Sequence, residues 1–226
     1  MTSTVRLMTY NIWLGGRRGA PLHELVRAVA PDVLVVNESP KRPLVSVREC
    51  RRLCELWGMR YVVGGRSAGS NLIAVRGPVE VRRVHSEVIP QPRSHPRRGL
   101  VVAQLRAHGR LLGVVGCHLS LIAGAHQDEV ERVLDAAASL RGPVVVGGDL
   151  NEPPGGQAWR QLARAGFVDQ GDESWPTFPA DRPSRRIDAL LVRGDATVLS
   201  HGDPGVPVEL QAAASDHRPV LAELQL

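Results

Sequence analysis

The chain has 226 residues, of which 43% are hydrophobic and 23% are charged, and its formal net charge is +5 at pH 7. This balance is typical of a folded globular protein and excludes disordered and collagen-like chains. The length suits one domain, so we expect residues 1–226 to form a single domain. With only four Trp, two Tyr and two Phe, the core depends on aliphatic side chains, and the many Val runs favour strands.

Strand-length apolar runs and helix-spaced apolar positions divide the chain into mixed elements. Strands are predicted at residues 5–11, 32–36, 59–63, 71–76, 79–84, 100–105, 111–117, 144–146, 187–192, 196–201 and 220–224. Helices are predicted at residues 21–30, 44–57, 125–140 and 157–165. Strand hairpins and helices alternate without a strict βαβ rhythm, which favours an α/β (α+β) fold of two packed mixed sheets with helices outside.

Residues 89–99, IPQPRSHPRRG, carry three prolines and three arginines, so this stretch is predicted as a loop. Residues 1–113 include 19 basic and 7 acidic residues, whereas residues 114–226 include 9 basic and 16 acidic residues. This asymmetry indicates an anionic partner for one half and a metal or acid cluster in the other. Lys41 is the only lysine, which argues against Schiff-base chemistry and a P-loop lysine.

The first residues show no charged segment followed by an apolar stretch, and no window approaches about 18 consecutive apolar residues. The sequence therefore predicts a cytoplasmic protein without membrane insertion, and we expect a monomer. The three cysteines, Cys50, Cys54 and Cys117, are an odd number without metal-binding spacing. They support neither a disulfide framework nor a zinc site.

Polar side chains follow several of the predicted buried strands at the point where each strand ends. They are Asn11, Glu38, His118, Asp149, Asn151, Asp188, Asp216 and His217. Each alone has an ordinary explanation, such as a helix cap or surface carboxylate at Glu38, a turn at Asp149 or a satisfied core histidine at His118. A carboxylate or imidazole at a buried strand end is costly without a partner, so the whole set predicts convergence on one another or on a cation.

Eight segments resemble the motif series of the endonuclease/exonuclease/phosphatase family, in the order of that family and over nearly the whole chain. They are TYNI (9–12), NES (37–39), SNLIAVR (70–76), GCHLS (116–120), GGDLNEPP (147–154), PTF (176–178), RRIDALLV (185–192) and SDHRPV (215–220). The resemblance implies a DNase I-like four-layer α/β/β/α sandwich and a magnesium-dependent phosphoester hydrolase. Two departures are Asn37 before Glu38, where the family usually has Gln, and Cys117 before His118.

Hard oxygen ligands suit Mg²⁺, with Mn²⁺ as a substitute, so Glu38 is predicted as principal metal ligand with Asp216 and Asn11 nearby. By similarity to the family, Asp149 orients or deprotonates the attacking water and Asn151 holds that water or a phosphate oxygen. His217 is expected to contact the phosphoryl group.

Two further residues complete the catalytic set that the resemblance implies. Asp188 is expected to hydrogen-bond His217 and raise its pKa. His118 is expected to serve as hydrogen-bond donor or general acid for the leaving group.

The family resemblance does not decide which class of phosphoester is the substrate. The basic first half and the arginines of the 89–99 loop favour nucleic acid, and Asn71, Arg97 and Arg98 are candidate substrate-binding residues. The alternative is a small-molecule or lipid phosphoester, although no exposed apolar hairpin or secretion signal supports a lipid. A third hypothesis is an inactive binding protein of the same fold, which the presence of every expected catalytic side chain disfavours.

Overall fold

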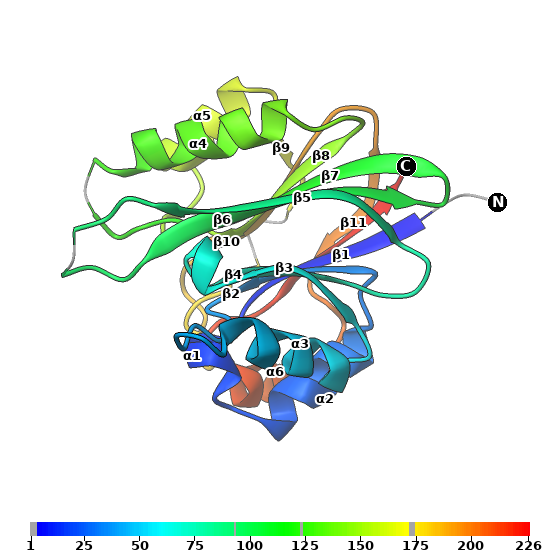
Figure 1. The fold of residues 1–226 in the computed structure, drawn as a ribbon, viewed down its shortest axis with the longest axis vertical. Coiled ribbons are helices and arrows are strands. Elements are labelled where there is room, and N and C mark those ends of the chain that lie inside the picture. The colour runs from blue at the N-terminus through cyan, green and yellow to red at the C-terminus, as the bar shows by residue number, and fades with distance from the viewer. Residues whose placement is uncertain (1–3, 93, 123, 172–174) are drawn as a thin grey trace.

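Two six-stranded mixed sheets pack face to face with helices on their outer faces (Figure 1). The computed structural model describes residues 4–92, 94–122, 124–171 and 175–226. In Figure 1, α2, α3 and α6 cover one sheet and α4 and α5 cover the other, which gives four layers. This architecture confirms the predicted α/β/β/α sandwich.

The first sheet has the order β11-β12-β1-β2-β4-β3. Its strands are β1 (Thr4–Asn11), β2 (Val33–Asn37), β3 (Arg60–Gly65), β4 (Asn71–Val75), β11 (Thr197–Gly202) and β12 (Val220–Gln225). The helices on its side are α1 (Trp13–Gly16), α2 (Ala20–Val29), α3 (Ser46–Leu56) and α6 (Val208–Ala214). β1 and β2 run parallel, so both end at the same edge of the sheet.

The second sheet has the order β5-β6-β7-β8-β10-β9. Its strands are β5 (Glu80–Ile89), β6 (Arg98–Ala107), β7 (Arg110–His118), β8 (Val144–Asp149), β9 (Val168–Asp169) and β10 (Asp188–Arg193). The remaining helices are α4 (His126–Ala138), α5 (Gln157–Arg164) and the 3-10 turn η1 (Arg66–Ala68). β7 and β8 form the parallel pair of this sheet.

Three apolar clusters explain why strands such as β2 are buried on both faces. One lies between the sheets and includes Val35, Val101 and Val145. The second packs α2 and α3 against the first sheet, and the third packs α4 and α5 against the second. The core is therefore built from aliphatic side chains, as the composition predicts.

Two local predictions were wrong. The helix predicted at 44–57 begins at Ser46, and the side chains of Leu44 and Val47 are exposed rather than buried. Leu44 has a φ of +65°, which a helix does not accept, and the buried face begins at Ser46, whose Oγ donates to the Pro40 carbonyl. The predicted loop at 89–99 is shorter, because β5 and β6 pair as far as Ile89 and Arg98.

Several short elements were not predicted from the sequence, namely α1, η1, β9 and α6. Each has two to seven residues, which is too short for a periodic apolar pattern to be recognised. Among the residues described, no helix has the length and apolar character needed to cross a membrane.

Candidate active site

The strand pairing brings the predicted site residues to one end of both sheets. In the first sheet Asn11 lies opposite Asn37, where the parallel strands β1 and β2 end. Glu38 directly follows Asn37 in the chain. In the second, His118 and Asp188 both pair with Asp149, one on each side of β8. The side chains that follow buried strands therefore meet across the two sheets, as the sequence predicts.

Asp149 lies at the centre of this cluster and is almost completely buried. Its Oδ1 accepts the backbone N–H of Asn151 at 2.9 Å, and its Oδ2 accepts Asn11 Nδ2 at 3.1 Å. His118 Nε2 and His217 Nε2 lie 3.3 and 3.8 Å from the same Oδ2. Burial raises the pKa of Asp149, with a further rise from the Asp188 charge, so this carboxylate is a stronger base than an exposed aspartate.

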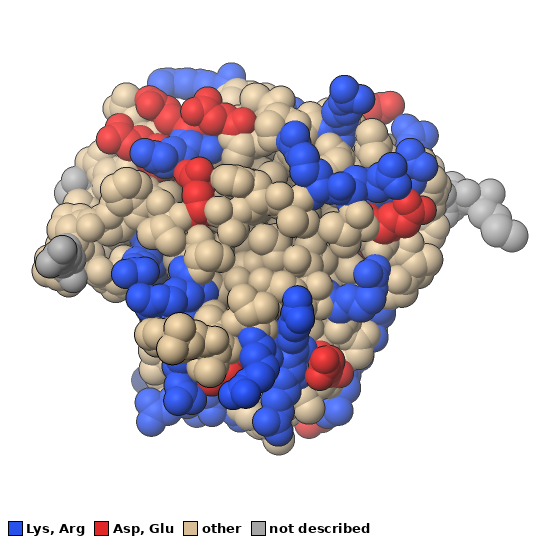
Figure 2. All heavy atoms as spheres, viewed as in Figure 1, with Lys and Arg blue, Asp and Glu red and all other residues tan. Residues whose placement is uncertain are grey.

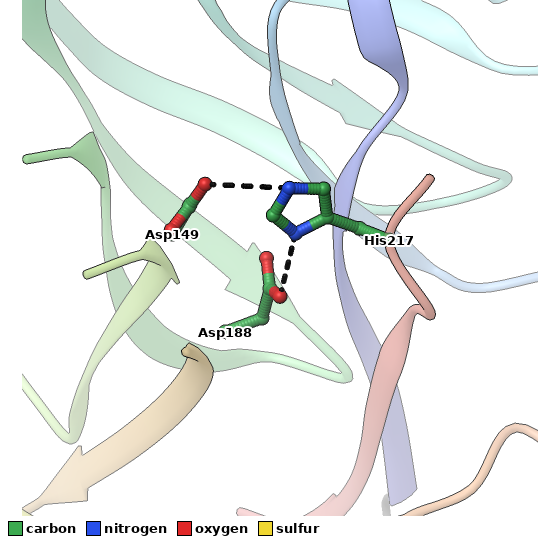
Figure 3. Close-up of side chains that lie close together, drawn as sticks. All are labelled: Asp149, Asp188 and His217. Carbon is green, nitrogen blue, oxygen red and sulfur yellow. Dashed lines mark hydrogen bonds and ion pairs between the residues drawn. The ribbon is translucent and has the colours of Figure 1, made fainter. Parts of the chain in front are cut away.

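His217 is held between two carboxylates (Figure 3). Its Nδ1 donates to Asp188 Oδ2 at 2.9 Å, while its ring packs on Phe178 with centroids 4.7 Å apart. Burial lowers the pKa of His217, but the Asp188, Asp149 and Asp216 charges outweigh it and raise the pKa to about 9. The ring is therefore an imidazolium at neutral pH, aimed at Asp149.

Asp188 is itself fixed by the PTF segment. Thr177 Oγ1 accepts the backbone N–H of both Ile187 and Asp188, at 3.1 and 3.2 Å. Asp188 is fully buried, and its Oδ1 has no hydrogen-bond partner among the described atoms. Its other oxygen is therefore committed to orienting His217.

His118 is in the opposite protonation state. Arg98 Nη1 lies 3.2 Å from His118 Nδ1, and because a guanidinium only donates, Nδ1 must be the acceptor. The ring proton is then on Nε2, which faces Asp149. Burial, followed by the Arg98 charge, lowers the pKa of His118 well below its usual value. His118 is a neutral hydrogen-bond donor.

Asn37 joins the two sheets beneath this cluster, a role that the sequence did not reveal. Its Nδ2 donates to Asn71 Oδ1 and to the Cys117 carbonyl, each at 2.8 Å, and its Oδ1 accepts the Asp149 N–H at 2.9 Å. Asn71 Nδ2 in turn donates to the carbonyls of Ala68 and Gly99. The Asn71 amide, predicted to bind substrate, is thus engaged with the framework.

The other predicted substrate-binding residues divide between surface and interior. Arg97 is exposed, whereas Arg98 is buried and its guanidinium is directed to His118. Asn151 is partly exposed, and its Nδ2 donates to the Leu119 carbonyl at 2.7 Å, which leaves its Oδ1 for a ligand. Arg93, in the same arginine-containing loop, lies outside the described residues.

The predicted metal ligands Asn11, Glu38 and Asp216 also lie together. Glu38 follows Asn37, the partner of Asn11, and Ser215 Oγ donates to the Asn11 carbonyl at 2.7 Å. Burial raises the pKa of Asp216 against the lowering effect of His217, and the Glu38 charge raises it further. A like-charged pair of hard oxygen donors beside a carboxamide fits a cation such as Mg²⁺.

A family model described as the endonuclease/exonuclease/phosphatase family matches residues 8–217. The chain belongs to this family. Hydrolases of the endonuclease/exonuclease/phosphatase family act on phosphoester bonds, and the buried Asp149, Asp188 and His217 offer three ligand atoms within 4.8 Å of one another. No curated protein gives a significant match to the sequence.

Solved structures of the endonuclease/exonuclease/phosphatase family share the whole fold with this chain. A family member from Bacteroides vulgatus is 19% identical with a TM-score of 0.78, covering 99% of each chain. A mannosyl-6-phosphatase from Bacteroides thetaiotaomicron is 17% identical with a TM-score of 0.75, covering 98% of this chain and 100% of its own. TDP2 from D. rerio, complexed with single strand DNA product, is 16% identical with a TM-score of 0.68, and the match covers 99% of this chain and 100% of the TDP2 chain.

Replacing the bridging amide with Asn37→Ala should lower the free energy of unfolding by about 3 kcal/mol, because it leaves the buried Asp149 N–H and two acceptors unpaired. Urea denaturation in metal-free buffer measures this. Thr197→Ala, at an exposed position of β11, is the control and should change stability by less than about 0.5 kcal/mol. A loss below about 1 kcal/mol for Asn37→Ala would contradict the bridging role.

The two imidazoles should titrate differently in long-range ¹H–¹⁵N NMR spectra. His217 should stay doubly protonated at pH 7 and lose a proton near pH 9, while His118 should show a single proton on Nε2 throughout. The folded pKa of His217 exceeds its unfolded value of about 6.5. Its protonation therefore stabilises the fold fully below that pH, and this contribution is lost as the pH rises towards 9. His217→Ala assigns the resonances, and titration of His217 near pH 6.5 would refute the assignment.

Proposed function

We propose that the protein is a metal-dependent phosphodiesterase that acts on nucleic acid. The observation that carries this proposal is the placement of Asp149 between a cationic imidazole and a neutral one, His217 and His118. An in-line displacement at phosphorus needs a base for the water, positive charge near the phosphoryl oxygens and a donor for the leaving oxygen. One cluster supplies all three.

In this proposal Asp149 accepts the proton of the attacking water as the water oxygen bonds to phosphorus. Asn151 Oδ1 orients that water, and the His217 imidazolium faces the phosphoryl oxygens. The P–O bond to the leaving group breaks as His118 Nε2–H donates a hydrogen bond to the leaving oxygen, and that oxygen takes its proton from solvent. Asp188 and Arg98 touch no substrate and fix the protonation states of His217 and His118 respectively.

The residues that would hold the metal are Glu38 and Asp216, with Asn11 beside them. A divalent cation there would offset negative charge on the phosphoryl oxygens. We favour this set over Asp149, Asp188 and His217, because Asp149 Oδ2 already accepts Asn11 Nδ2 and His217 Nδ1 already donates to Asp188 Oδ2. Mg²⁺ is the expected ion and Mn²⁺ a substitute.

A nucleic-acid substrate is supported by the basic character of the chain and by one structural relative. On the face of the molecule drawn in Figure 2, Lys and Arg side chains lie in more places than Asp and Glu side chains. TDP2, which shares the fold, was solved with single strand DNA product. Because a mannosyl-6-phosphatase has the same fold, a phosphosugar monoester is the second candidate substrate.

We further propose that residues 1–226 act as one catalytic domain and as a monomer.

Hydrolysis assays separate these functions. Bis(p-nitrophenyl) phosphate, p-nitrophenyl phosphate and a supercoiled plasmid are each tested with Mg²⁺, Mn²⁺ or EDTA. Cleavage of the diester and the plasmid with metal, and none in EDTA, is the expected result. Cleavage of the monoester alone would replace the nuclease by a phosphatase. Inactivity on all three substrates would contradict the proposal.

Glu38→Gln should weaken metal binding while leaving the fold intact. The metal concentration for half-maximal diester hydrolysis should rise at least about tenfold, a cost that even indirect partners of a metal site reach. Mn²⁺ binding, followed by water-proton relaxation, should fall in parallel and gives a readout independent of turnover. The matched control is Glu55→Gln, an exposed position near the end of α3. Unchanged Mn²⁺ affinity for Glu38→Gln would exclude Glu38 as a ligand.

A further inference from the structure

A cationic pocket opens beside the proposed catalytic cluster, with a volume of about 200 Å³. Its lining residues are Lys41, Arg66, Gly69, Ser70 and Arg97. We propose that this pocket binds a second phosphate group of the substrate, one that is not cleaved. The inference rests on the proposed phosphoesterase function and adds a requirement for its substrate, namely two phosphates a short distance apart.

The charges of the pocket have no counterpart among the described residues. Its lining holds three cations and no carboxylate. Within residues 4–92 and 94–122, where these side chains lie, neither Lys41, Arg66 nor Arg97 forms an ion pair with any described residue. Three converging unpaired cations repel one another, and a bound dianion would relieve that repulsion.

The backbone around the pocket is firmly held, which fixes the positions from which the three charged side chains extend. Gly69 has a φ of +61°, and a Cβ there would overlap the backbone of Arg98 and Gly99. The Ser70 carbonyl accepts the Ser39 N–H at 2.8 Å, and the Arg66 N–H donates to Ser46 Oγ at 2.9 Å. These contacts join η1, the start of β6 and the segment after β2, which are the three segments that carry the charges.

The pocket adjoins the reaction centre through three of its lining residues. Arg97 precedes Arg98, which contacts His118, and Ser70 precedes Asn71, which is bonded to Asn37. Lys41 is three residues after Glu38, and its charge is among the causes that lower the pKa of His118. One substrate can therefore reach both sites.

The size of the pocket favours a small group. Pockets for drug-sized ligands occupy about 300–1,000 Å³, and 200 Å³ is below that range. The pocket is lined by no Leu, Ile, Val or aromatic residue, so it lacks the bulky apolar side chains on which a nucleobase stacks. A phosphate, which is compact and doubly charged, matches both properties.

Binding of two dinucleotides in EDTA tests the proposal without requiring catalysis. Thymidylyl-thymidine with a 5′-phosphate, pTpT, and the same dinucleotide without it, TpT, are titrated into the protein at low ionic strength by ¹H–¹⁵N NMR. The wild type should bind pTpT about tenfold more tightly, which corresponds to one charge-assisted contact. Inorganic phosphate should compete with pTpT and reduce its apparent affinity to that of TpT.

Arg66→Glu should remove the preference for pTpT and leave TpT binding unchanged, while Arg66→Lys should keep most of it. Arg164→Glu, at an exposed position at the end of α5, controls for net charge. Equal affinity of the wild type for pTpT and TpT, or an Arg66→Glu variant that retains the preference, would overturn the pocket assignment. Failure of the proposed function shows separately, as absence of metal-dependent hydrolysis of any phosphoester.

Discussion

Asp149→Asn should lower kcat/KM for diester hydrolysis by about a thousandfold, within the range that general-base catalysis contributes. Neither imidazole beside Asp149 can take the proton of the attacking water, because His118 Nδ1 is occupied by Arg98 and His217 is already protonated. An amide at position 149 keeps the volume and still accepts the Asn151 N–H, but cannot take a proton.

The fold should tolerate this replacement. Burial raises the pKa of Asp149, so the ionised carboxylate costs stability, and a neutral amide avoids this cost, which offsets the loss of the acceptor for Asn11 Nδ2. The melting temperature should therefore stay within about 5 °C of the wild type, equivalent to roughly 1–2 kcal/mol for a chain of this size. Asp135→Asn, exposed on α4, is the matched control. Activity within tenfold of the wild type would remove Asp149 from the role of base.

The convergence of the site could be predicted because strand ends are visible in a sequence. Asn11, His118 and Asp149 each end an apolar run, and the parallel pairs β1–β2 and β7–β8 bring such ends to one edge. The order of the family motifs then indicated the two-sheet architecture. Both features are local in sequence, and the structure confirms the fold.

The contacts that set protonation states could not be predicted. Asn37 bonds to Asp149 across 112 residues and His217 to Asp188 across 29, and no spacing rule links such positions. Arg98 was expected to meet substrate because it belongs to the arginine-rich stretch 89–99, which was predicted as a loop whose arginines could contact phosphates. The extension of β6 to Arg98, through pairing with Ile89, directs this side chain inward to His118 instead. The register between β5 and β6, which the sequence did not reveal, therefore determines where the Arg98 side chain lies.

His217→Ala should reduce kcat by about a hundredfold to a thousandfold, the cost of removing one charged group that stabilises a transition state. Substrate binding should change less, because the proposed metal ligands and the cationic pocket remain. Steady-state kinetics on bis(p-nitrophenyl) phosphate separates the two effects, since a loss confined to KM would indicate ground-state binding alone. Phe178→Leu, which alters the packing of the ring and keeps its charge, should cost far less.

Asp188→Asn tests whether the carboxylate acts through His217. Without the Asp188 charge the pKa of His217 should fall from about 9 towards its ordinary value, so the alkaline limb of the kcat/KM profile should move to lower pH. The double variant should be no slower than His217→Ala alone, because both changes remove one function. Additive losses, or an unmoved alkaline limb, would mean that Asp188 contributes by another route. If instead the alkaline limb moves and the double variant is no slower, the catalytic unit is the pair of His217 and Asp188. In that pair a buried cation is kept charged by a carboxylate that never contacts the substrate.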